Sequence, residues 1–196
     1  MPMFDAILEA VQLMSYGMLL LIIAPLFPFL YVVMRWRAPG TGHTGIGTLG
    51  AIHYFIVMAA LLLLAGAANL CYGWVSITPV NPEMTRISWG TLSGSVAFLV
   101  INLVLLRFTR DLSDLPDVRR MFIGFFLVIA GLTAFAALLL LCVSYFSEVK
   151  DGDAEAGILR RDAMKLYGFW VIYFLGGYLA STWWLTRTAP DSSARS

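Results

Sequence analysis

Long stretches of apolar residues, separated by short polar segments, make up most of the chain. Crossing the hydrocarbon core of a bilayer takes about 20 apolar residues in a helix. The stretches of roughly that length predict five transmembrane spans, at about 13–34, 52–75, 90–106, 121–146 and 164–185. Residues 4–12 carry their apolar side chains on one helical face, which indicates either a short interfacial helix before the first span or one overlong, tilted first helix.

The apolar stretches favour helices over the strands of a membrane barrel. Barrel strands alternate apolar and polar residues over about ten positions. The runs at 61–68 and 135–142 do not alternate. In lipid every backbone polar group needs an internal partner, which a helix supplies by itself. We therefore expect an all-α, polytopic transmembrane helical bundle with five spans, forming one domain over residues 1–188 and followed by a polar tail at 189–196.

The composition supports a membrane location. Of the 196 residues, 60% are hydrophobic and 13% are charged. A soluble domain has about half and about a quarter, respectively, so this chain has too few charges to cover its apolar surface in water. The net charge of +1 provides no basic surface for nucleic acid. The lipid bilayer is the expected surrounding, and we expect the bacterial inner (plasma) membrane.

The basic residues near the span ends favour an orientation with the N-terminus outside and the C-terminus in the cytoplasm. The larger group then lies inside and consists of Arg35, Arg37, Arg107, Arg110, Arg119, Arg120, Arg187 and Arg195. The smaller group lies outside and consists of Arg86, Lys150, Arg160, Arg161 and Lys165.

Residues that carry chemistry are scarce in the predicted spans. None of the twelve acidic residues falls in the middle of a span, which counts against a proton relay within this chain alone. No nucleophile has a base nearby in the sequence, so the pattern favours a non-catalytic protein. Cys71 and Cys142 lie in apolar runs and are interpreted as small buried side chains. No metal site or bound cofactor is expected.

One histidine offers an exception. His53 lies at the start of the second span, where an imidazole could ligate a haem shared with another chain or contact a quinone. The alternative interpretation is an interfacial imidazole that hydrogen-bonds to the backbone or to a lipid headgroup.

Small and polar residues form the clearest pattern. Gly176, Gly177 and Ser181 share one face of the fifth span, where small side chains let two helix backbones approach closely. Similar stripes occur in the second span, at Ala59, Gly66, Asn69 and Gly73, and in the fourth, at Ala130, Ala134 and Ala137. Such faces pack helices either inside one bundle or against another subunit.

The third span carries polar side chains at Ser93, Ser95 and Asn102. A buried amide in lipid needs a hydrogen-bond partner, and Asn102 is expected to find it on another helix. The alternative is that these side chains line a polar path.

Three functions remain open. The leading hypothesis is a non-catalytic membrane subunit or homo-oligomer that packs with other membrane subunits or with copies of itself. The second is an oligomeric channel or passive facilitator for an ion or small solute, with Ser93, Ser95 and Asn102 along the path. The third is a haem- or quinone-linked redox subunit that uses His53.

Overall fold

The computed structural model describes residues 30, 33–34, 46–80, 82–109, 116–147 and 154–187. Apart from residues 30, 33 and 34, the predicted first span at 13–34 lies outside the described residues. The predicted interfacial helix at 4–12 and the tail at 189–196 lie outside them as well.

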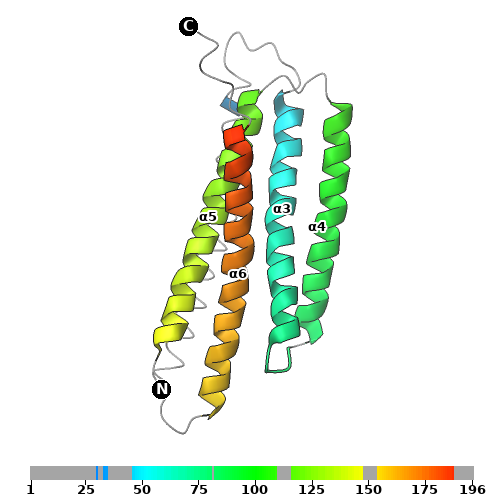
Figure 1. Ribbon diagram of the computed structural model, residues 1–196. Helices are drawn as coiled ribbons and strands as arrows, with labels where there is room; N and C mark the ends of the chain where they lie inside the picture. The colour runs from blue at the N-terminus through cyan, green and yellow to red at the C-terminus, as the bar shows by residue number, and fades with distance from the viewer. Residues whose placement is uncertain are drawn as a thin grey trace.

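The described chain forms four long helices that run alternately up and down (Figure 1). They are α3 (Ile46–Val75), α4 (Pro82–Phe108), α5 (Pro116–Phe146) and α6 (Ala154–Arg187). Proline opens both α4 and α5, where its fixed φ suits the first helical position and its missing N–H leaves no bond unmade. The all-helical fold expected from the sequence is confirmed for the described residues.

Three of these helices are long and apolar enough to cross a membrane, at Thr48–Val75, Pro82–Phe108 and Val118–Phe146. They coincide with the predicted second, third and fourth spans. The apolar part of α6 is rich in Trp, Tyr and Gly, which lower its mean hydropathy, and α6 is not among the three. Five spans are therefore not confirmed.

Each helix begins earlier than the predicted span, and α6 differs most. It starts at Ala154, whereas the predicted span starts at about 164, so the helix includes about ten residues that lie before the predicted span. Hydropathy marks where a chain enters hydrocarbon, but a helix continues into the headgroup region because its internal hydrogen bonds are satisfied there as well.

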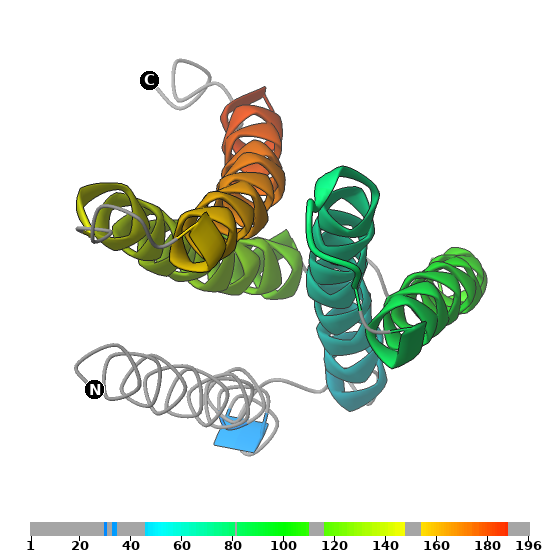
Figure 2. The ribbon, with the colours of Figure 1, turned by 90° about the horizontal axis from the view of Figure 1, so that it is seen from below.

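Helix α3 occupies the centre of the described bundle, with α4 on one side and α5 and α6 on the other (Figure 2). The main apolar core lies between α3, α5 and α6. Its buried members are Leu49, Val57, Leu61, Val118, Phe122, Phe126, Ile129, Ala130, Ala134 and Phe174. The predicted stripe of the fourth span belongs here, since Ala130, Ala134 and Ala137 are all buried.

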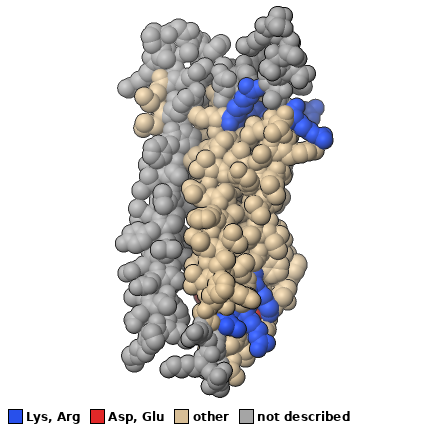
Figure 3. Space-filling model, turned by 60° about the vertical axis from the view of Figure 1, so that its left-hand side comes forward, with Lys and Arg blue, Asp and Glu red and all other residues tan. Residues whose placement is uncertain are grey.

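Charged side chains lie at the two ends of the bundle, with an apolar belt between them on the face shown in Figure 3. We call one end the arginine end; its members are Arg107, Arg119, Arg120 and Arg187. We call the other the clamp end; its members are Glu83, Arg86, Glu155, Arg160, Arg161, Asp162 and Lys165. This distribution suits a protein whose middle lies in hydrocarbon.

Candidate functional site

Helix α4 buries a polar stripe instead of an apolar one. Its buried residues are Ser88, Ser95 and Asn102, separated by seven positions. Its extensive contacts in the described chain are with α3, so these side chains form the α3–α4 interface. A spacing of seven keeps side chains on one face where two helices pack at a small crossing angle.

Two polar side chains of this stripe bond to their own helix. The Ser88 hydroxyl donates to the Met84 carbonyl at 2.8 Å, and the Asn102 amide donates to the Phe98 carbonyl at 2.8 Å. Because such bonds to the preceding turn satisfy the hydrogen-bond donor, the polar side chain can lie against a neighbouring helix at no further cost. The partner found for the Asn102 amide is a backbone carbonyl of α4, not a group on another helix.

A glycine brings the two backbones of this interface together. A Cβ added at Gly66 would lie 3.3 Å from the Leu92 nitrogen and 3.4 Å from the Ser88 carbonyl oxygen. Both atoms belong to the backbone of α4, which cannot shift as a side-chain end could. Gly66 is buried, and so is Ala59 one heptad earlier. These two members of the predicted second-span stripe therefore pack within the chain.

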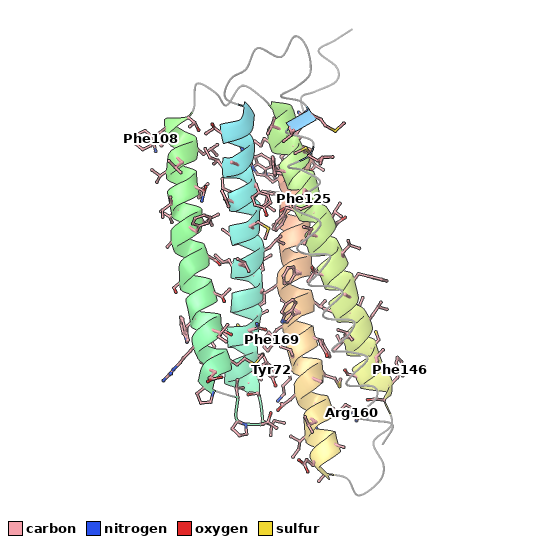
Figure 4. The ribbon with its side chains drawn as sticks, turned by 180° about the vertical axis from the view of Figure 1, so that it is seen from behind. Tyr72, Phe108, Phe125, Phe146, Arg160 and Phe169 are labelled. Carbon is pink, nitrogen blue, oxygen red and sulfur yellow. The ribbon has the colours of Figure 1, made fainter. Side chains whose placement is uncertain are left out.

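The rest of the α4 surface is apolar and exposed, including the edge at which the Phe98 ring packs against Phe55 of α3. Its exposed large side chains are Met84, Ile87, Trp89, Val96, Phe98, Val100, Ile101, Leu103, Val104, Leu105 and Phe108. Phe108, which is 82% exposed, points away from the bundle (Figure 4). Gly90 and Gly94 are also exposed, and a Cβ at either would meet no atom of the described residues within 4 Å. Their spacing of four makes a GxxxG pattern on the outer surface.

The predicted polar residues of the third span do not lie together. Ser95 and Asn102 are buried at the α3–α4 interface, whereas Ser93 is exposed. The Ser93 hydroxyl donates to the Trp89 carbonyl at 2.8 Å. In a helix, residues two apart point to different sides, which explains the separation.

The predicted small-residue face of α6 is divided. A Cβ at Gly177 would lie 2.9 Å from the Leu64 side chain of α3, so Gly177 allows these two helices to approach. Gly176 is exposed, with nothing within 4 Å of an added Cβ. Ser181 is partly buried. Neighbouring positions on a helix differ by about 100°, so only part of a broad stripe can face one neighbour.

Two polar pairs of side chains join α3 to α6. The Trp170 indole N–H donates to the Asn69 side-chain oxygen at 2.9 Å. The Cys71 thiol and the Tyr173 hydroxyl lie 3.0 Å apart. Asn69, a predicted packing residue, thus bonds within the bundle.

Asp162 makes the most extensive polar contact of the described chain, and the sequence did not single it out. Its carboxylate accepts the backbone N–H groups of Ile77 at 2.9 Å and Thr78 at 2.8 Å, and the Thr78 hydroxyl at 2.6 Å. The residue is only 2% exposed. Lys165 lies 3.4 Å from the same carboxylate and donates to the Val75 carbonyl at 2.9 Å. This clamp fixes the end of α3 to the start of α6.

The hydrogen bonds of the clamp favour the ionised carboxylate. Burial would raise the pKa of the Asp162 carboxyl, but the bonds from Ile77, Thr78 and Lys165 outweigh it and lower the pKa from 3.8 to about 2. Asp162 precedes the predicted fifth span, so this charge lies at the membrane edge. Arg160, labelled in Figure 4, donates in a similar way to the Ser147 carbonyl just after α5, at 3.0 Å.

His53, the predicted cofactor candidate, is buried between α3 and α5. Its Nδ1 lies 2.9 Å from the Leu49 carbonyl, and its ring stacks on Phe122 with a centroid distance of 6.0 Å. Across the described ranges, no group of three or more His, Cys, Asp or Glu side chains could hold a metal ion.

Two features of this arrangement were missed from the sequence. The seven-residue spacing from Ser88 through Ser95 to Asn102 was a usable signal for the polar interface of α4. For Asp162, the only signal in the sequence was its position beside an apolar stretch, since the residues that donate to its carboxylate lie 84 and 85 positions away.

The chain was compared with protein-family models, curated proteins and solved structures, and none matches.

Proposed function

We propose that the protein is a non-catalytic membrane subunit that assembles sideways in the bilayer, through the outer face of α4, with a second copy or with another membrane subunit. The arrangement of α4 carries this proposal. Its buried polar side chains, Ser88, Ser95 and Asn102, face α3, while most of its large apolar side chains and the Gly90–Gly94 pair are exposed.

The physics of association in lipid supports the choice of this face. Lipid tails are as apolar as leucine, so exposed leucines alone give little reason for two helices to meet. Close backbone approach does, because it increases van der Waals contact. Gly90 and Gly94 permit such an approach, and the neighbouring Ala97 is also exposed and small.

We propose that α6 is a further span and that the arginine end faces the cytoplasm. No Asp, Glu, Lys or Arg lies between Lys165 and Arg187, which leaves a stretch long enough to cross the hydrocarbon. The carboxylates whose side chains are described, Glu83, Glu155 and Asp162, gather at the clamp end with its basic residues. In this orientation the inner side carries eight of the thirteen Lys and Arg residues of the sequence, and the side richer in these residues is expected to face the cytoplasm.

With a first span at 13–34, this arrangement corresponds to five spans, an outer N-terminus and a cytoplasmic C-terminus. The bacterial inner membrane is the location that we propose for it.

The experiment is a mass measurement in mild detergent on the full chain and on two leucine variants. Gly94→Leu places a bulky side chain on the outer face of α4. Gly124→Leu is the matched control, because an added Cβ there also meets nothing within 4 Å but lies on α5. We expect the unmodified protein and Gly124→Leu to migrate as a complex and Gly94→Leu to lose it. A strictly single unmodified chain with no co-purifying protein would overturn the proposal.

A further inference from the structure

Two arginines at the arginine end are held by tryptophan rings. The guanidinium carbon of Arg119, on α5, lies 4.2 Å from the centre of the Trp184 ring on α6. The guanidinium carbon of Arg187 lies 4.0 Å from the centre of the Trp183 ring. Arg120 is exposed beside Arg119 in the first turns of α5. The start of α5 and the end of α6 thus carry three arginines at the same end of the bundle.

Stacking on a ring leaves the hydrogen-bonding groups of arginine available. The attraction to the ring uses the flat face of the guanidinium, whereas its N–H donors point outward in the plane. No carboxylate whose side chain the structure describes lies at this end of the bundle. A planar fork of N–H groups matches the oxygens of a phosphate.

We propose that Arg119, Arg120 and Arg187 bind the phosphate of an anionic phospholipid at the α5–α6 edge of the arginine end. The proposal goes beyond lateral assembly through α4 and does not depend on it. A lipid is favoured over free phosphate because tryptophan and arginine at the end of an apolar belt lie at headgroup depth. Exposed apolar side chains continue along both helices towards the membrane centre and would contact the acyl chains. They include Val128, Leu132, Leu175 and Leu179.

The test measures binding of short-chain phosphatidylglycerol to the full-length protein in a neutral detergent, with phosphatidylcholine and inorganic phosphate as the other probes. The double variant Arg119→Gln/Arg187→Gln is compared with Arg86→Gln/Arg161→Gln, which removes the same charge at the clamp end. One basic residue near a surface contributes about a fivefold factor in binding of an anionic lipid. We expect the first pair to weaken phosphatidylglycerol binding by about 25-fold and the second pair to leave it unchanged.

Three results would overturn the proposal. Equal weakening by both pairs would show attraction by net charge alone. If inorganic phosphate bound as tightly as phosphatidylglycerol, the site would recognise phosphate alone and not a lipid. If phosphatidylcholine bound as tightly as phosphatidylglycerol, the negative charge of the lipid would not contribute to binding.

If the glutamine pair does not fold, Arg119→Lys provides the second arm. Lysine keeps the charge and loses the planar fork, so phosphatidylglycerol binding should fall severalfold, and unchanged binding would overturn the proposal.

Discussion

The two sides of α3 are packed by different kinds of side chains. Towards α5 and α6 it meets a conventional apolar core that contains Phe122, Phe126 and Phe174. Towards α4 it meets Ser88, Ser95 and Asn102. In the most apolar stretch of α3, 39% of the residues are buried, whereas in the corresponding stretch of α4 only 11% are buried. A helix can thus be strongly apolar, contact one neighbour through small polar residues and keep its apolar surface for its surroundings.

The difference shows what lipid changes about helix packing. In water, the apolar face of α4 would turn inward, because burial removes it from solvent. In a bilayer that driving force is absent between helices, and the closeness of the contact matters more. Gly66, facing the backbone of α4, is the clearest sign of such closeness. We therefore expect substitutions at the α3–α4 interface to change stability according to how closely they let the two helices pack, and not according to how apolar they are.

The largest effect is expected for Gly66→Leu. The new side chain would press on the backbone of α4 near Leu92, which can move only by separating the two helices. Overpacking costs about 1–3 kcal/mol in stability and sometimes more, and contact with backbone places this variant at the upper end. Reversible unfolding by SDS in mixed micelles measures the change.

The control for that variant is Gly73→Leu on the same helix, where an added Cβ meets nothing within 4 Å. Equal destabilisation by both leucines would mean that the close approach at Gly66 does not hold the hairpin together.

The next effect is expected at the clamp. Asp162→Asn removes the negative charge that accepts the N–H groups of Ile77 and Thr78, and hydrogen bonds to a charged group contribute about 1.5–3 kcal/mol. Loss of stability of about that size is expected near neutral pH. Thermal unfolding followed by circular dichroism in detergent checks it, with Arg161→Gln, an exposed neighbour, as the control.

The clamp also predicts a pH dependence. The pKa of Asp162 is lower in the folded protein than its ordinary value of 3.8, so the carboxylate stabilises the fold above about pH 4. This contribution should disappear as the pH falls through about 2. The unmodified protein should lose stability over that window, and Asp162→Asn should lose less. Parallel pH curves for the two proteins would contradict the assignment.

The sequence predicted the helices better than it predicted the contacts. Three apolar stretches became three long apolar helices because spanning requires length and hydropathy, and both can be counted along the chain. The small-residue stripes at Ala130 and Gly66 were also found in advance. Their partners were not, because which neighbour a face meets depends on residues far away in the sequence. Asp162 is the clearest example, since the groups that donate hydrogen bonds to its carboxylate lie in the turn after α3.

The smallest effect is expected for Asn102→Ala. The Asn102 amide bonds to its own helix, so its loss should cost as little as the loss of a polar contact between membrane helices, which averages about 0.6 kcal/mol. Unfolding in mixed micelles should show a destabilisation of about that size. In liposomes the same variant should leave ion and solute flux as it is in the unmodified protein. A change in flux specific to Asn102→Ala would favour a channel lined by Ser95 and Asn102 over a packing role for this stripe.

Photo-crosslinking in native membranes tests most directly whether the outer face of α4 meets another membrane protein. A photoreactive amino acid is placed at Ala97, on the exposed face of α4, and in a second protein at Leu132, which is exposed on α5. We expect one discrete protein adduct from position 97, of twice the chain mass or of the mass with one other subunit, and none from position 132. No protein adduct from position 97, or the same adducts from both positions, would contradict it.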